Sequence, residues 1–296
     1  MKSFIASIFT ACFITLSGPV FATVRVVTTI PDFGSIAKTI GGDRVSVTAL
    51  VKPTQDPHFV DAKPSLVLAL NRADLLLTAG MELEAGWLPP LVSGARNRDI
   101  LPGAKGHLEC ASLIVPMEVR SVNRAEGDIH PGGNPHYWTD PRNGVRLAIG
   151  IADKLKALDP THAAQYDAGR DRFVEALKSA MARWRKALTP LKGTKVVVYH
   201  ESWVYFLEWS GLTQAGALEP KPGIPPTPSH VASLISAVSG QNVRFMMQES
   251  FYPTQLSRLF AAKSGAALKV LPTMTGAAGT HSYIDLIDTI VKELLK

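Results

Sequence analysis

The sequence predicts an α/β fold of two lobes, each built on a parallel sheet, joined by one long rigid helix. Two observations predict it. Short β-branched or apolar runs alternate with helical stretches at both ends of the chain, and a long helical pattern lies between them. Strands that alternate with helices are typical of a parallel sheet flanked by helices. We therefore expect an N-terminal lobe over residues 23–158, a connecting helix over 159–188 and a C-terminal lobe over 189–296.

The N-terminal lobe begins with a β-branched run, a turn at Pro31 and a helical stretch that Gly41-Gly42 ends. Asp74–Thr78 is a nearly continuous apolar run, typical of a strand buried on both faces. The elements expected in this lobe are a strand over Val24–Thr29, a helix over Phe33–Ile40, a strand over Val45–Leu50, a helix over Pro64–Leu70 and a strand over Asp74–Thr78.

The connecting helix is predicted from its start signal and its apolar period. Asp159 is a candidate N-cap and Pro160 a candidate first helical residue. From Tyr166 to Leu188, apolar residues recur at three- and four-residue steps and basic residues fill the other side. The stretch contains one glycine, Gly169, so two shorter helices broken near Gly169 are the alternative.

The C-terminal lobe repeats the alternation of strands and helices. Its expected elements are a strand over Lys195–Tyr199, a helix over Thr227–Ser239, a strand over Val243–Gln248, a helix over Pro253–Ser264, a strand over Ala267–Val270 and a final helix over Tyr283–Lys296.

Composition and charge exclude several classes of protein. Hydrophobic residues make up 46% of the 296 residues and charged residues 19%, so the chain has enough apolar surface for a core. The 23 glycines and 21 prolines together make up about 15% of the 296 residues. This fraction is well below the roughly 25–30% of glycine plus proline that marks a low-complexity chain. The formal net charge is +6, but the basic residues are spread without a dense run, so nucleic-acid binding is not indicated.

The first 22 residues have the pattern of a secretory signal peptide. Lys2 precedes an apolar stretch from Phe4 to Leu16, and Val20-Phe21-Ala22 is a candidate cleavage site after Ala22. The stretch is too short to span a bilayer, which needs about 20 apolar residues. Export with cleavage is therefore expected rather than a membrane anchor. Removal of this segment leaves Cys110 as the single cysteine, so we expect no intrachain disulfide.

Three of the eight histidines lie in unusual loop contexts. His58 follows the second strand in Asp56-Pro57-His58, His136 lies in a segment bounded by prolines, and His200 directly follows the strand Lys195–Tyr199. Ligands of open α/β sheets bind beyond the carboxyl ends of the strands, and imidazole is the commonest neutral metal ligand. A metal site is one interpretation of these residues, and hydrogen-bonded structural histidines are the other.

Several motifs give the chain a family resemblance. They are Thr28-Thr29-Ile30-Pro31, Gly41-Gly42-Asp43-Arg44-Val45, Gln55-Asp56-Pro57-His58, Ala73-Asp74-Leu75, Gly133-Asn134-Pro135-His136-Tyr137-Trp138-Thr139-Asp140-Pro141 and His200-Glu201-Ser202-Trp203-Val204-Tyr205-Phe206. Through them the whole predicted mature chain resembles the zinc/manganese solute-binding proteins of bacterial ABC importers. The resemblance implies a metal held in a cleft between two lobes, a periplasmic location, an ABC transporter permease as partner, and a chain that is a monomer and not an enzyme.

The resemblance also implies a ligand set. His58 and His136 match the two ligands of the N-terminal lobe, and His200 matches the third, which is His or Glu in the family. The fourth ligand is usually an Asp, but here His281 stands at that position in Gly279-Thr280-His281-Ser282-Tyr283. His281 is the expected ligand, with Glu249 or a water as alternatives.

The remaining histidines, His107, His162 and His230, are expected to have structural or surface roles. His130 is a candidate for holding metal transiently near the mouth of the cleft.

The ligand chemistry favours Zn²⁺ as the bound ion. Imidazole nitrogen suits Zn²⁺, whereas Mn²⁺ prefers oxygen donors, and the manganese members of the family add two carboxylates. Zinc is therefore expected, with Mn²⁺ second. Two other functions remain open: a periplasmic metallochaperone or adhesin of the same fold, and a zinc hydrolase. The hydrolase is disfavoured because the sequence lacks His-Glu-x-x-His.

Overall fold

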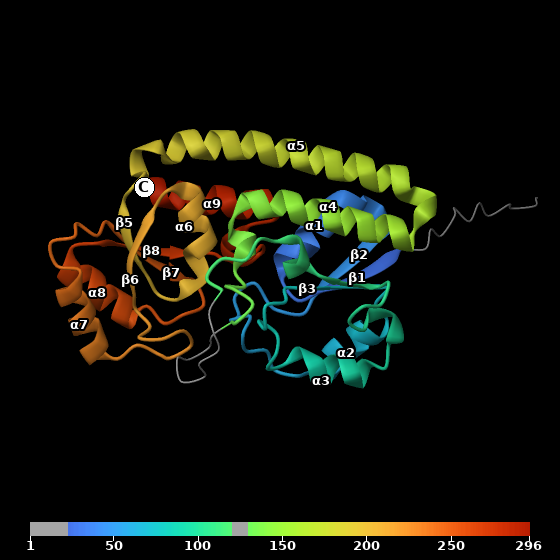
Figure 1. Cartoon of the computed structure of the whole chain (residues 1–296), viewed down its shortest axis with the longest axis horizontal. Helices are drawn as coiled ribbons and strands as arrows, with labels where there is room; N and C mark the ends of the chain where they lie inside the picture. The colour runs from blue at the N-terminus through green and yellow to red at the C-terminus, as the bar shows by residue number, and fades with distance from the viewer. Residues whose placement is uncertain (1–22, 120–129) are drawn as a thin grey trace, which may run out of the picture.

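The computed structural model describes residues 23–119 and 130–296 and contains two α/β lobes (Figure 1). The signal peptide predicted over residues 1–22 lies outside these ranges. Within them, no helix combines the length and apolar character needed to cross a membrane. Cys110 is buried and free.

The N-terminal lobe contains a parallel four-stranded sheet in the order β2-β1-β3-β4. Its strands are β1 (Val24–Thr28), β2 (Val45–Ala49), β3 (Leu75–Thr78) and β4 (His107–Glu109). The helices are α1 (Pro31–Gly41), α2 (Pro64–Asn71), α3 (Leu88–Ala95) and α4 (Pro141–Leu158). Helices α2 and α3 pack together on one side of the sheet, while α1 lies against the other side with α4 packed onto it (Figure 1).

The C-terminal lobe contains a second parallel four-stranded sheet, in the order β6-β5-β7-β8. Its strands are β5 (Lys195–Val198), β6 (Thr213–Ala217), β7 (Phe245–Glu249) and β8 (Ala267–Leu271), and its helices are α6 (Val204–Ser210), α7 (Pro228–Ala237), α8 (Gln255–Ser264) and α9 (Tyr283–Leu295). Alternate residues of the strands pack on opposite faces. Val197 and Met246 belong to a small core with α7 and α8, and Val196 and Met247 belong to the main core.

The long helix α5 (Ala163–Leu188) is continuous and runs past both lobes (Figure 1). It packs on α1 and α4 of the N-terminal lobe and on α9 of the C-terminal lobe. The predicted rigid connection is therefore confirmed, and the alternative break near Gly169 is wrong. A single main core extends from the N-terminal lobe through α5 to one face of the second sheet.

The start of this helix differs from the prediction. Residues 160–162 form a 3-10 turn, and α5 begins at Ala163. The Asp159 carboxylate does not cap the backbone. Instead its Oδ2 accepts from the hydroxyl of Tyr166 at 2.8 Å and lies 2.7 Å from Nδ1 of His162. Two side chains that fold back on Asp159 replace the expected cap.

The predicted strands and helices are present, with boundaries shifted by a few residues. Five further elements were not predicted: α3, α4, α6, β4 and β6. Two of them, β4 and β6, are strands at an edge of their sheets.

Candidate metal centre

Three buried histidines meet between the lobes. One ring nitrogen from each of His58, His136 and His200 lies within 4.8 Å of the others. The ring centroids are 5.1 Å apart for His58 and His136, and 5.2 Å apart for His200 and either of the other two. In the described part of the chain, no other group of three or more His, Cys, Asp or Glu side chains is arranged in this way.

Each histidine is positioned by a different loop. His58 lies in the loop between β2 and α2, and His136 lies just before the 3-10 turn Tyr137–Thr139. His200 directly follows the carboxyl end of β5 and precedes the 3-10 turn Glu201–Trp203. Two ligand candidates thus belong to the N-terminal lobe and one to the C-terminal lobe.

His58 and His136 are held by the same local device. Oδ1 of Asp56 accepts from the backbone N–H of His58 at 3.0 Å and lies 2.7 Å from its Nδ1. Oδ1 of Asn134 does the same for His136, at 3.0 Å to both nitrogens. Asp and Asn side chains readily accept hydrogen bonds from the backbone two residues on. Here that local turn also fixes the imidazole ring.

His200 is held by a residue distant in sequence. Its Nδ1 lies 2.7 Å from Oε2 of Glu219, which is buried just beyond the carboxyl end of β6. The same oxygen accepts from the backbone N–H of Gly223 at 3.0 Å. The neighbouring strands β5 and β6 thus bring the carboxylate to the ring.

These three contacts leave Nε2 of each ring as the nitrogen that can bind a ligand. Because each Nδ1 faces an oxygen that can only accept, each neutral ring carries its proton on Nδ1 and leaves a lone pair on Nε2. Nε2 of His58 is buried and has no hydrogen-bond partner in the described residues. Histidines that bind metal commonly donate their other ring N–H to a carboxylate or carbonyl. The arrangement therefore suits a metal ion.

The three rings differ in electrostatic environment. Burial, together with the positive charges of His58 and His200, holds the pKa of His136 well below its usual value. Burial also opposes the charged form of His200, but the hydrogen bond and charge of Glu219 outweigh it and raise the pKa of His200. Burial likewise opposes ionisation of Asp56, yet its bond to His58 prevails and lowers the pKa of Asp56.

Glu249 is a buried carboxylate beside His200. It ends β7, which pairs with β5, and the backbone N–H of Tyr199 donates to the carbonyl of Met247 at 2.9 Å. The ends of these two strands bring Glu249 close enough for its charge to act on His200. Burial raises the pKa of Glu249 to about 7, against the opposing charge of His200 and the nearby hydroxyl of Ser202. Neither of its oxygens makes a hydrogen bond of normal geometry in the described residues.

The structure does not bring His281 into the cluster. Its side chain is exposed, and its backbone N–H donates to Oδ2 of Asp285 at 2.7 Å as part of the start of α9. Among the remaining histidines, His130 lies with its ring centroid 5.5 Å from that of His58, and both rings line a pocket of about 210 Å³. His107, His162 and His230 lie elsewhere, beside Thr78, Asp159 and the carbonyl of Ala217.

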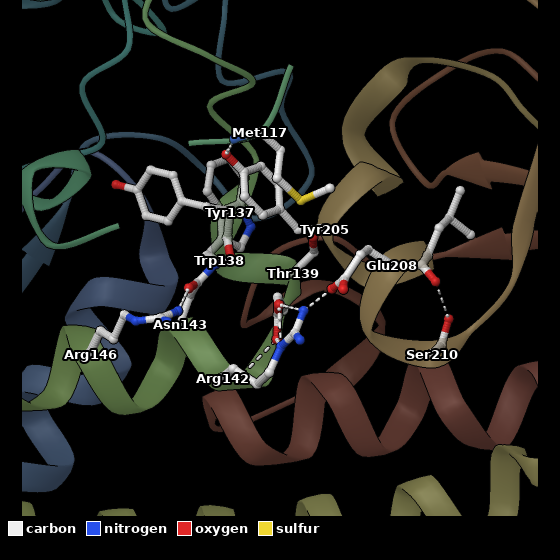
Figure 2. A network of polar contacts seen from close by, with 12 residues as sticks. Met117, Tyr137, Trp138, Thr139, Arg142, Asn143, Arg146, Tyr205, Glu208 and Ser210 are labelled. Carbon is white, nitrogen blue, oxygen red and sulfur yellow. Dashed lines mark hydrogen bonds and ion pairs between the residues drawn. The ribbon is translucent and has the colours of Figure 1, made fainter. Parts of the chain in front are cut away.

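Hydrogen bonds between the lobes fix the segment that carries His136. The hydroxyl of Tyr205, on α6, donates to the carbonyl of Asn134 at 2.9 Å and accepts from the backbone N–H of Met117 at 2.9 Å. Figure 2 shows Tyr205 beside Met117, and Arg142, which reaches from α4 to Glu208 on α6. Nδ2 of Asn134 also donates to the carbonyl of Glu201 at 2.8 Å, next to His200.

Four supporting residues, Asp56, Asn134, Glu219 and Tyr252, are not among those expected from the sequence. The Asp-Pro-His and Asn-Pro-His patterns could have indicated Asp56 and Asn134, because the acceptor lies two residues before the histidine in both. Glu219 had no such signal. Tyr252, whose hydroxyl donates to Oδ2 of Asp56 at 3.2 Å from the other lobe, had none either.

Comparison with known proteins agrees with this architecture. The high-affinity zinc uptake system protein ZnuA of Paracoccus denitrificans (strain Pd 1222) is 27% identical over 290 residues, which cover 89% of this chain and 88% of that protein. The manganese ABC transporter substrate-binding lipoprotein PsaA of Streptococcus pneumoniae is 26% identical over 235 residues, which cover 77% and 72% of the two chains.

A solved structure described as the crystal structure of ZnuA superposes with a TM-score of 0.78 at 26% identity, covering 92% of this chain and 98% of that one. A family model described as zinc-uptake complex component A, periplasmic, matches residues 26–296. The chain therefore belongs to the family of periplasmic A components of zinc-uptake complexes.

Proposed function

We propose that this chain binds one divalent metal ion, Zn²⁺ in preference to Mn²⁺, in the periplasm and delivers it to the membrane permease of an ABC importer. His58, His136 and His200 are the proposed ligands. The relatives are named as zinc uptake proteins and as metal or manganese ABC transporter substrate-binding lipoproteins, which supports transport rather than catalysis. Export after cleavage at Ala22 and a monomeric state are part of this proposal.

One observation carries the proposal: the three imidazoles each have Nδ1 against an oxygen acceptor and a ligand nitrogen within 4.8 Å of the others. Three neutral nitrogen donors suit Zn²⁺ better than Mn²⁺. The acceptors are two carboxylates and one amide, so negative charge lies close behind the rings. That charge favours a cation at the centre.

Glu249 is better placed than His281 to supply a fourth donor. A carboxylate that is buried without a hydrogen bond is costly unless a cation or a proton compensates its charge. Glu249 meets that description beside His200, whereas His281 is exposed at the start of α9. We therefore propose Glu249 as the fourth ligand, with His281 and water as the alternatives.

Metal content and competition titration test the histidine ligands. Protein purified natively from the exported fraction should contain one zinc per chain by elemental analysis. His58→Ala, His136→Ala and His200→Ala should each lower zinc affinity by more than the roughly 10–100-fold typical of losing an outer-shell partner. His230→Ala, outside the cluster, is the matched control. Wild-type affinity in any two of the three cluster variants would refute the assignment.

The fourth ligand is tested by the ratio of Zn²⁺ to Mn²⁺ affinity. Glu249→Gln removes the charge at similar volume and should raise this ratio, because a charged oxygen donor favours the harder ion. His281→Ala should leave the ratio unchanged. If this ratio instead changes in His281→Ala, and falls in His281→Asp because the added carboxylate favours Mn²⁺, His281 is the ligand.

Delivery distinguishes an importer component from the rival functions. With the cognate permease and ATPase reconstituted in vesicles, the zinc-loaded chain should drive zinc uptake and the His200→Ala chain should not. A metallochaperone would transfer zinc to a soluble acceptor without the permease. A hydrolase would turn over ester or amide substrates in the presence of zinc, and we expect no such turnover.

A further inference from the structure

The N-terminal lobe contains a cavity that the metal centre does not use. It has a volume of about 600 Å³ and lies between α3, the carboxyl ends of β3 and β4, and the segment after β3. None of the three clustered histidines lines it. Cavities that hold small organic ligands commonly measure about 300–1,000 Å³. Its size therefore suits a small molecule.

The walls of the cavity are mainly apolar. Leu76 of β3, Leu88 and Val92 of α3, and Ile100 of the following turn all line it. Apolar walls with a few polar groups are typical of sites for organic ligands. A hydrated inorganic ion would gain little from such a lining.

Three of the side chains that line the cavity carry carboxylates. Glu82 and Glu109 line it with exposed side chains, and neither carboxylate has a hydrogen bond or an ion pair in the described part of the chain. Glu109 lies over Gly80, where an added Cβ would be 2.5 Å from its Oε1. A third lining carboxylate, Glu84, is instead occupied by the backbone N–H groups of Ala79 at 2.6 Å and Gly80 at 3.1 Å.

Among residues 23–119 and 130–296, those that line the cavity include no lysine or arginine. The lining histidine, His107, carries little positive charge near neutral pH, because burial and the charge of Lys154 lower its pKa. Lys154 is not itself a lining residue, and its amine donates to the carbonyl of Lys105 at 3.3 Å. The two unpaired carboxylates therefore dominate the charge at the cavity.

We propose that this cavity is a second ligand site, which takes a small organic cation with an apolar body and an ammonium group. The apolar body would lie between α3 and the sheet, against Leu76 and Val92. The ammonium group would pair with the carboxylates of Glu82 and Glu109. An anion or a neutral molecule of the same shape would not form an ion pair with these two carboxylates.

Three probes of matched shape test the proposal on the full zinc-loaded chain: 4-phenylbutylammonium, 4-phenylbutanol and 4-phenylbutyrate. Binding is followed by calorimetry and by backbone amide NMR shifts around α3. Because ion pairs with exposed carboxylates are partly screened by water, the ammonium should bind about three- to tenfold more tightly than the alcohol. The carboxylate should bind most weakly.

Variants assign the effect to the cavity. Glu82→Gln combined with Glu109→Gln should abolish the preference for the ammonium while weak binding of the alcohol remains. Val92→Phe should reduce binding of all three probes by filling the cavity. Glu175→Gln, an exposed acid on α5, is the matched control, and thermal melts check the folding of each variant.

Two results would overturn the proposal. Equal affinity for ammonium and alcohol would mean apolar partitioning without recognition of charge. No shift around α3 with any probe at millimolar concentration would mean that the cavity is not a ligand site. His58→Ala should bind the ammonium as the unaltered chain does, so the result is independent of the proposed metal function.

Discussion

Nδ1 of His200 lies 2.7 Å from Oε2 of Glu219, and both side chains are buried. The two residues are 19 positions apart and follow the carboxyl ends of the paired strands β5 and β6. The backbone N–H of Glu219 also donates to the carbonyl of Tyr199 at 3.1 Å. The carboxylate therefore sets the orientation and the protonated nitrogen of a ring proposed to bind metal.

Replacement of Glu219 should weaken zinc binding without abolishing it. Glu219→Ala removes the acceptor, and loss of an outer-shell partner typically costs about 10–100-fold in metal affinity. Glu219→Gln can still accept from Nδ1 through its amide oxygen, so its loss should be smaller. A chelator competition titration measures both, with Glu175→Gln as control. Wild-type affinity in Glu219→Ala would contradict this role.

Zinc affinity should fall as the pH is lowered from about 7 to 5, because protons compete with the metal for imidazole nitrogen. The pKa of His200 is raised and that of His136 is lowered, so the ring of His200 is protonated first as the pH falls. Competition should therefore begin at His200. Titrations at several pH values should show this fall begin at a lower pH in Glu219→Gln. An affinity that does not change over this range would argue against histidine ligands.

The pH dependence of stability should include a contribution from Asp32, at the contact between the lobes. Its Oδ1 accepts from the hydroxyl of Thr275 at 2.9 Å. Burial, opposed by the hydrogen bonds from Thr275, raises its pKa from 3.8 to about 7. The folded state therefore holds this proton more tightly than the unfolded state does. The contribution of Asp32 to the free energy of unfolding is fully present below the pKa of the unfolded state, 3.8, and is lost as the pH rises towards the folded-state pKa of about 7.

Asp32→Asn should remove this dependence, because an amide does not ionise. In urea titrations of the metal-free proteins, the wild type should lose stability relative to Asp32→Asn between pH 5 and 8, by on the order of a few kcal/mol. The change with pH is the readout, since the amide also alters hydrogen bonding with Thr275 at every pH. The same difference between the two proteins at both pH values would rule out this contribution.

Gly169→Ala should destabilise the protein although alanine is the better helix former. An added Cβ at Gly169 would lie 2.1 Å from the carbonyl oxygen of Ile40, a backbone atom at the end of α1. Overpacking typically costs about 1–3 kcal/mol, more than the roughly 1 kcal/mol gained in helix propensity. Gly94→Ala in α3, where the nearest atom would be 3.8 Å away, is the control and should stabilise slightly. Urea unfolding compares the two, and a stabilised Gly169→Ala would contradict the close packing of α5 on α1.

The sequence by itself determined the described strands other than β4 and β6, the long helix, and the candidate histidines His58, His136 and His200. Apolar runs such as Leu75–Thr78 become buried strands because only the interior of a sheet accommodates them on both faces. His58 and His136 are fixed by an acceptor two residues earlier in the chain. Such contacts form wherever the segment lies, so the local pattern is sufficient to predict them.

Helix α4 shows what the sequence could not indicate. It contains Gly144 and Gly150, which lower helix propensity. Added Cβ atoms at these positions would lie 2.5 Å from Cε1 of Tyr283 and 2.4 Å from Cδ1 of Leu113. The glycines are therefore required by close packing against residues far away in the sequence, and only the folded chain reveals that reason.

Only the tertiary structure decided which residues surround the third histidine. Glu219, Glu249 and Tyr252 reach the centre from the ends of β6 and β7 and from the loop that follows β7, and their place depends on strand order. His281 matches a ligand position by its sequence, yet its loop leaves it exposed. A contact between two distant segments depends on the packing of the whole core. A local sequence pattern can therefore suggest a ligand residue, but it cannot determine whether the fold brings that residue to the metal centre.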